Sequence, residues 1–184
     1  SADLDSMFYS SKAGEFAHDV SKLAQETDGY RIDANTVLRT KELRRKLNLE
    51  KSKAILNTTA SAVLREALSH TDWAKGKTPR VMETSLMGDS DIGFFSVSGQ
   101  SANPSSSDLM TEFYHQLRSD DALRSKVMGQ SSDEIIIGQG CSSCSMIASD
   151  TRLSMMAAPL AKLTSDVLSG RYIDEGGQFN IGYL

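Results

Sequence analysis

Apolar residues recur at helical spacing through the first third of the chain. They form one helical stripe over residues 3–27. A second helix is predicted to begin at a cap formed by Asn35 or Thr36, and a third is predicted over residues 50–69. We expect the single tryptophan, Trp73, to close a core beneath these helices.

The pattern changes after residue 79, where short runs of β-favouring residues alternate with turns. Residues 80–87 and 92–98 are predicted strands, joined by the turn sequence Gly-Asp-Ser-Asp at residues 88–91. Residues 98–107 are rich in Ser, Gly, Asn and Pro, which favours a surface loop. Helices are expected from Asp108 onward and again after residues 119–121, the second ending at Gly129.

A methionine-rich stripe at alternating spacings of three and four predicts a long C-terminal helix, which must accommodate Pro159 by a kink or a new start. We interpret this stripe as core, and its alternative is a contact with another subunit, which would make the chain a homo-oligomer through residues 146–167. The stripe comprises Met146, Leu153, Met156, Leu160, Leu163 and Val167. Alternating apolar residues around Gly176-Gly177 then predict a hairpin from Tyr172 to Tyr183.

These elements predict an α+β fold. The N-terminal helices and the long C-terminal helix would pack on a small, mostly antiparallel sheet that ends in the hairpin. A chain of 184 residues suits one core, so we expect a single domain over residues 1–184, with a helical subregion at 1–75 and a mixed subregion at 80–184. No apolar run approaches the length of about 20 residues that a membrane-spanning helix needs, and no membrane partner is expected.

Charge is distributed unevenly along this chain, whose formal net charge is −4. Residues 31–53 contain eight basic and three acidic residues, which suggests a surface with a preferred partner. An acidic protein is the favoured partner. Nucleic acid, bound by a helix-turn-helix over residues 40–70, is the alternative, and a solvated helix face needs no partner at all. The predicted partner-binding residues are Arg39, Lys41, Arg44, Arg45, Lys51 and Lys53.

One stretch combines features of a reactive site. In residues 133–146 three isoleucines predict a buried strand, a Gly-Gln-Gly turn follows, and Cys141 and Cys144 fall where a helix should begin. A helix N-terminus favours a thiolate, so the two cysteines could form a redox pair, or one could act as a nucleophile with His115 as its base. The alternative without chemistry is that one cysteine is a small core residue and the other is partly exposed. No second pair of metal ligands is present, and we predict no metal and no cofactor.

No complete catalytic set is visible, and whether the chain is an enzyme stays open. The leading hypothesis is a non-enzymatic protein-interaction module, an assembly component or a secreted factor, that binds an acidic partner through its basic helices. The alternatives are a cysteine-dependent enzyme at Cys141 and Cys144 and a nucleic-acid-binding protein that uses residues 39–53. The cysteines fix no compartment, so the cytoplasm is the default expectation. Because the chain starts at Ser1 rather than at methionine, a processed or secreted form is compatible with it.

Overall fold

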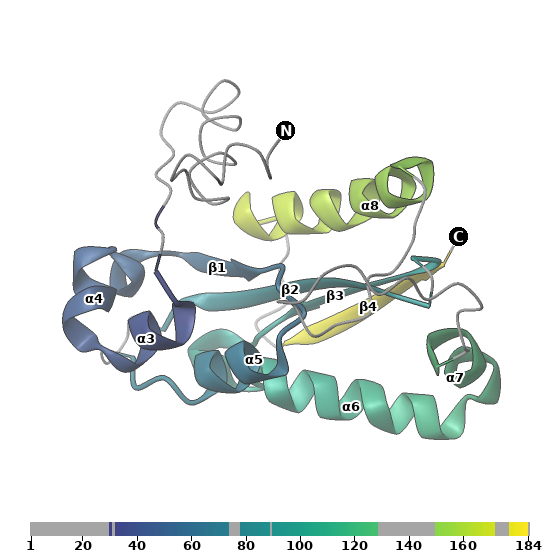
Figure 1. Ribbon diagram of the computed structural model, residues 1–184, viewed down its shortest axis with the longest axis horizontal. Coiled ribbons are helices and arrows are strands. Elements are labelled where there is room, and N and C mark those ends of the chain that lie inside the picture. The colour runs from purple at the N-terminus through teal and green to yellow at the C-terminus, as the bar shows by residue number, and fades with distance from the viewer. Residues whose placement is uncertain are drawn as a thin grey trace, which may run out of the picture.

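The computed structural model describes residues 30, 32–73, 78–88, 90–128, 150–171 and 177–183. In these residues the chain forms a four-stranded sheet with helices on both faces (Figure 1), which confirms the predicted α+β class. The elements in chain order are α3 (Ala34–Arg39), α4 (Lys41–Lys46), η1 (Leu49–Lys51), β1 (Ala54–Asn57), α5 (Ala62–Ser69), β2 (Arg80–Met87), β3 (Ile92–Val97), η2 (Gln100–Ala102), α6 (Ser106–Ser119), α7 (Asp121–Met128), α8 (Asp150–Leu168) and β4 (Gln178–Tyr183).

The strands lie in the order β1-β2-β3-β4. β1 runs parallel to β2, with α5 as the crossover between them, whereas β2 with β3 and β3 with β4 are antiparallel pairs. The prediction of a mostly antiparallel sheet is therefore confirmed, and so are the two strands on either side of the turn at residues 88–91. β4 occupies the second arm of the predicted hairpin and pairs with β3, while residues 172–176 of its first arm lie outside the described residues.

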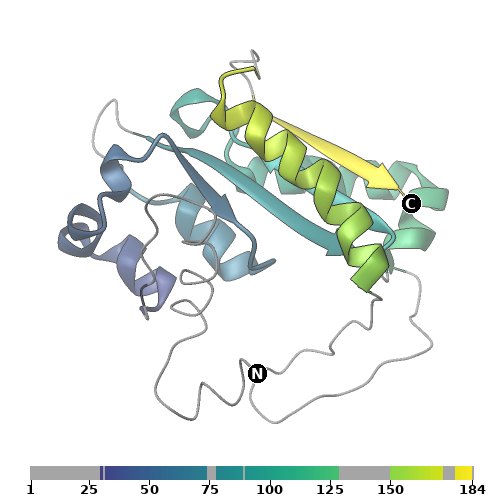
Figure 2. The ribbon, with the colours of Figure 1, turned by 90° about the horizontal axis from the view of Figure 1, so that it is seen from above.

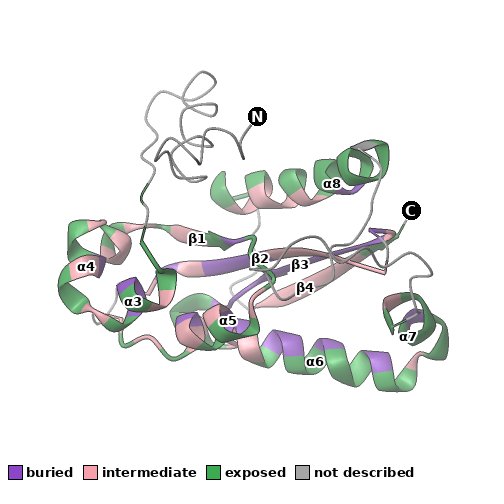
Figure 3. Cartoon of the chain, in the orientation of Figure 1, coloured by how far each residue is buried: buried purple, intermediate pink, exposed green. Residues whose placement is uncertain are grey.

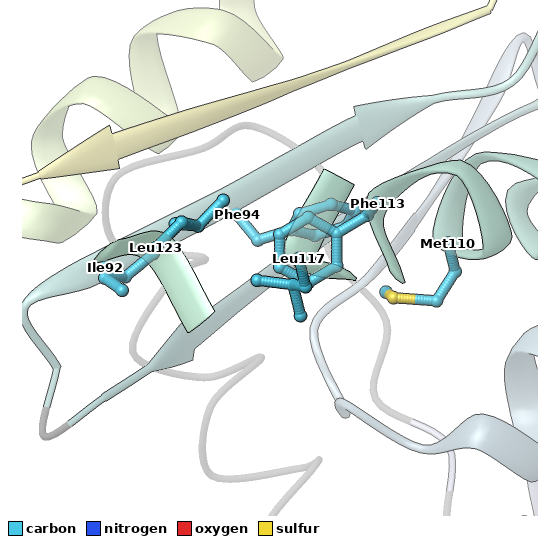
Figure 4. Close-up of a cluster of buried hydrophobic side chains, with 6 residues drawn as sticks. All are labelled: Ile92, Phe94, Met110, Phe113, Leu117 and Leu123. Atoms are coloured by element: carbon cyan, nitrogen blue, oxygen red, sulfur yellow. The ribbon is translucent and has the colours of Figure 1, made fainter. Parts of the chain in front are cut away.

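α6 and α7 cover one face of the sheet, and α8 covers the other (Figure 2). Every residue of β3 is buried because both faces of this strand are covered. On the α6 face, Phe94 of β3 packs on Phe113 of α6 with ring centroids 5.0 Å apart. The cluster around this contact, drawn in Figure 4, comprises Ile92, Phe94, Met110, Phe113, Leu117 and Leu123.

On the opposite face the methionine-rich stripe of α8 packs against the sheet. Leu160, Leu163 and Val167 contact a second buried cluster formed by Met82, Phe95 and Val97. Gly93 of β3 lies directly below Met156, since a Cβ at this position would be only 2.6 Å from the Met156 Cε. The interpretation as core is thus confirmed for Met156, Leu160, Leu163 and Val167, whereas Leu153 is 37% exposed and Met146 lies outside the described residues. The helix continues through Pro159 instead of starting again there. Its alternative role as a subunit contact stays a prediction.

A third cluster lies beside β1, where α3 and α5 pack together. Leu38, Leu68 and Val81 are its buried residues, and Trp73 packs against them as predicted. The clusters together account for the distribution of buried positions in Figure 3, which concentrate in β2, β3 and the inner face of α6.

The prediction of one helix over residues 50–69 was wrong. This segment forms η1, then β1, and only then α5. Short apolar runs fit a strand or a helix equally well, and here the pairing of β1 with β2 decides the outcome. The hydroxyl of Ser61 accepts a hydrogen bond from the Leu64 N–H at 3.3 Å, and this cap starts α5 well after the strand.

The helix expected after Asn35 or Thr36 also differs from the prediction. Its cap is Asp33, whose Oδ2 accepts hydrogen bonds from both the backbone N–H and the hydroxyl of Thr36 at 2.8 Å. These hydrogen bonds lower the pKa of Asp33 below its usual value. Thr40 then adopts an extended conformation, which divides the predicted helix into α3 and α4.

Candidate partner-binding surface

Most of the predicted basic residues lie exposed at one end of the molecule. They project from α3, α4 and η1 and from the residues just before β1, and α7 lies at the far end (Figure 1). The exposed predicted residues are Arg39, Lys41, Arg45, Lys51 and Lys53. Four of them, all except Arg45, form no ion pair with any described residue. Their charges are therefore available to a partner.

Arg44 differs from the other five because only 6% of it is exposed. Its guanidinium donates hydrogen bonds to the carbonyl oxygens of Leu38 and, at 3.2 Å, of Asp72. The same group lies 6.0 Å from the centroid of the Trp73 ring. Arg44 thus connects α4 with α3 and with the segment that follows α5. Its role is structural, because its charge is buried beneath the surface.

Glu50 lies close to two neighbouring arginines, Arg44 and Arg45. Its carboxylate oxygens lie 3.8 Å from the Nε of Arg44 and 3.8 Å from the Nε of Arg45. The Arg45 side chain is 66% exposed, and ion pairs at this distance in contact with water contribute little free energy. Arg45 is therefore only loosely held.

A broad hollow of about 740 Å³ lies between α3, α4 and α5. Arg39 and Lys41 contribute to its lining, but so do Glu66 and Asp72. Because cations and carboxylates are mixed here, this hollow does not select a partner of one charge. The glutamate is also engaged in the protein itself, since the Ser107 hydroxyl donates a hydrogen bond to its Oε1 at 2.8 Å.

An apolar pocket of about 280 Å³ adjoins β1 on the same end of the molecule, and we call it the β1 pocket. Side chains from α3, β1 and α5 line it, together with Tyr30 and Ile32 from the residues before α3. Three of its large apolar residues, Tyr30, Ile32 and Leu56, are 44–50% exposed. Such a gathering of exposed apolar side chains is typical of a binding surface. The sequence did not reveal it because β1 was predicted to be helical.

Asn57 adds a polar group to the β1 pocket. Its side chain is buried, and its Oδ1 accepts hydrogen bonds from the Thr59 N–H at 3.1 Å and from the Thr59 hydroxyl at 2.8 Å. Its Nδ2 donates to none of the described residues. Since a buried donor without an acceptor costs free energy, an acceptor supplied by a ligand would be favourable here.

Only one residue of the predicted thiol site, His115, lies within the described residues. Cys141 and Cys144 lie outside the described residues, as does the Gly-Gln-Gly turn before them. His115 is exposed on α6, and its ring makes no hydrogen bond or ion pair within the described ranges. A reactive thiol at Cys141 or Cys144 therefore stays a prediction.

The described residues show neither a cluster of metal ligands nor a membrane-spanning helix. They contain no group of three or more histidine, cysteine, aspartate or glutamate side chains placed to hold a metal ion. None of the described helices is long and apolar enough to cross a membrane.

Comparisons with known proteins do not assign the chain to a family. No protein-family model matches it, and no curated protein matches it either. An inference of function therefore depends on the basic residues and the β1 pocket.

Proposed function

We propose that this protein is an interaction module that binds an acidic protein partner through the basic surface around β1. One observation carries the proposal. Lys51 and Lys53, exposed and without an ion pair to any described residue, lie immediately before the strand that lines the exposed β1 pocket. Cations and an apolar pocket are thereby combined on one surface.

In protein interfaces, charged and apolar groups contribute to binding in different ways. Exposed charges accelerate encounter and select partners of opposite charge, but each contributes little affinity. Buried apolar contacts supply most of the binding free energy, which a few anchoring side chains dominate. The lysines would therefore contribute specificity for an acidic partner, and the pocket would contribute most of the affinity.

An acidic protein is a better candidate than nucleic acid for two reasons. The helix-turn-helix hypothesis needs a second helix directly after Asn48, and η1 and β1 occupy that segment instead. An exposed apolar pocket also offers nothing to a phosphate backbone, which is bound mainly by cations.

The test compares partners captured from the native host by the unchanged protein and by the charge-reversed variant Lys51→Glu with Lys53→Glu. The matched control is Arg118→Glu with Arg124→Glu, which changes the net charge equally but lies on α6 and α7. Captured proteins are quantified by mass spectrometry after nuclease treatment, and circular dichroism verifies that each variant is folded.

We expect acidic proteins to be lost from the first variant and retained by the control. An unchanged set of captured proteins in the Lys51 and Lys53 variant would overturn the proposal. Partners that disappear with nuclease treatment in every sample would indicate nucleic acid instead.

A further inference from the structure

We propose that the acidic partner contributes an extended segment that adds to β1 as a fifth strand and places an apolar side chain in the β1 pocket. This inference rests on the proposed function and specifies how the partner is held. It depends on three features of β1, namely its free edge, its neighbouring pocket and its flanking cations.

The free edge follows from the sheet order and the register. β1 is the first strand in the order, so among the described strands only one of its sides is paired. The Arg80 N–H donates to the Lys53 carbonyl at 3.1 Å, and residue pairing is parallel from Ala54 with Arg80 onward. In a parallel pair, alternate residues direct their backbone groups to the partner strand. The backbone N–H and C=O groups of Lys53, Ile55 and Asn57 are therefore directed toward β2. Those of Ala54 and Leu56 are directed away from the sheet.

The outward backbone groups of Ala54 and Leu56 make no hydrogen bond to other described residues. Such a row of N–H and C=O groups is a template for another strand. Short length and adjacent lysines also protect sheet edges against unwanted pairing, and β1 has both. Protection against pairing does not, however, explain the exposed apolar pocket beside β1.

The β1 pocket adjoins this strand and includes Ile55, Leu56 and Asn57 in its lining. Its volume is about 280 Å³. Since pockets for drug-sized ligands begin at about 300 Å³, this one suits a few side chains better than a separate small molecule. Successive side chains of an added strand point to opposite faces, so an apolar residue at every second position could reach the pocket. This is how strand addition combines backbone affinity with side-chain specificity.

The flanking polar groups define the rest of the occupant. Lys51 and Lys53 lie at the start of β1, where acidic residues of the segment would meet them. Asn57 lies at its other end, and its Nδ2, which has no partner among the described residues, could donate to a carbonyl or carboxylate oxygen. The charge of the two lysines favours an acidic segment over a second copy of this surface, which would bring like charges together.

The first part of the experiment uses the full chain and a fluorescent peptide of about seven residues, enough for a short strand. The peptide alternates valine or phenylalanine with polar residues and carries two acidic residues at each end. Binding is measured by fluorescence anisotropy. Two further peptides are N-methylated at alternate residues in opposite frames, because an added strand uses the amides of only one of its edges.

We expect one N-methylated frame to lose binding and the other to retain it. Equal affinities in the two frames would overturn strand addition. The variant Ile32→Asp should weaken the unmodified peptide roughly tenfold or more, because it places a charge at the rim of the β1 pocket. Val63→Asp is the matched control, since Val63 is an exposed apolar residue that lines the other hollow.

The second part distinguishes failure of this inference from failure of the proposed function. If reversal of Lys51 and Lys53 removes the native partner but the peptide does not bind, strand addition is overturned and the acidic interaction stands. If neither the partner nor the peptide responds to charge reversal, both are overturned. Sedimentation of the protein alone provides the last readout. A dimer that dissociates in Leu56→Asp would identify a second copy as the occupant and overturn the proposed partner.

Discussion

Arg65 of α5 and Glu83 of β2 form a bidentate ion pair in the interior of the protein. The Arg65 Nε lies 2.8 Å from Glu83 Oε2, and its Nη2 lies 2.7 Å from Oε1. The hydrogen bonds from the guanidinium to Glu83 raise the pKa of Arg65 above its usual value. Glu83 is also the register neighbour of Asn57 in β1 and of Ser96 in β3. The pair therefore fixes α5 to the sheet directly beside the strand that borders the β1 pocket.

We predict that Glu83→Leu lowers the free energy of unfolding by roughly 3–5 kcal/mol, because it leaves the buried guanidinium of Arg65 without its counter-charge. Urea unfolding followed by circular dichroism measures this loss. The double variant Arg65→Met with Glu83→Leu should recover much of it, since the uncompensated charge is gone. If Glu83→Leu alone were as stable as the original protein, water or another group would have to compensate the charge of Arg65.

Two glycines with left-handed backbones should differ in their tolerance of alanine. Gly88 has φ +55° and a Cβ there would lie 2.2 Å from the backbone oxygen of Lys126, whereas Gly170 has φ +71° and open space around it. Gly170→Ala should cost about 1–2 kcal/mol from the backbone alone. Gly88→Ala should cost roughly 1–3 kcal/mol more, because α7 must move. Thermal unfolding measures both, and equal losses would contradict the contact between Gly88 and α7.

The start of α6 predicts a pH dependence of stability. Both the N–H and the hydroxyl of Ser105 donate hydrogen bonds to Asp108 Oδ2 at 2.8 Å, and they lower the pKa of Asp108 below its usual value of 3.8. Because the pKa is lower in the folded state, this stabilisation is present above pH 3.8 and is lost as the pH falls through the folded value.

Asp108→Asn should therefore cost about 1 kcal/mol at neutral pH, and the difference from the unchanged protein should shrink below about pH 4. Unfolding in urea at a series of pH values measures it. Glu112→Gln, an exposed change on the same helix, serves as the control. A constant difference across the series would exclude the carboxylate of Asp108 as its source.

Salt should affect the rate of partner binding more than its lifetime. The exposed charges of Lys51 and Lys53 act over a screening length of about 10 Å at 0.1 M salt. For the acidic peptide described above, the association rate should fall as salt is raised, while dissociation, set by the β1 pocket, changes little. Stopped-flow anisotropy separates the two rates. A peptide with amides in place of its carboxylates should show no such fall, and an equal response from both peptides would contradict steering by the lysines.

The central hairpin could be predicted from sequence because its signals are local. The β-favouring runs in residues 80–87 and 92–98 and the turn residues at 88–91 predict β2, β3 and their turn without reference to the rest of the chain. β1 could not be predicted in this way. Its short apolar run around Ile55 and Leu56 acquires strand geometry from pairing with β2, which lies more than twenty residues further along the chain.

The exposure of the basic segment was predicted in part. The basic segment indicated a charged surface, and the positions of Arg39, Lys41, Arg45, Lys51 and Lys53 agree with exposure. Composition could not show that Arg44 turns inward, because an arginine buries its stem and guanidinium only where carbonyl oxygens such as those of Leu38 and Asp72 are assembled by the fold. The β1 pocket had no signal in the sequence, since its lining comes from α3, η1, β1 and α5, which are separate along the chain.

The position of β4 has a consequence for synthesis of the chain. β4 pairs with β3, yet residues 98–177 separate the two strands in sequence. On the ribosome, the apolar strand Ile92–Val97 emerges long before its second neighbour is translated. Until then the nascent chain carries an open, aggregation-prone strand in the middle of its future core, so we expect cotranslational chaperones to associate with it during that interval.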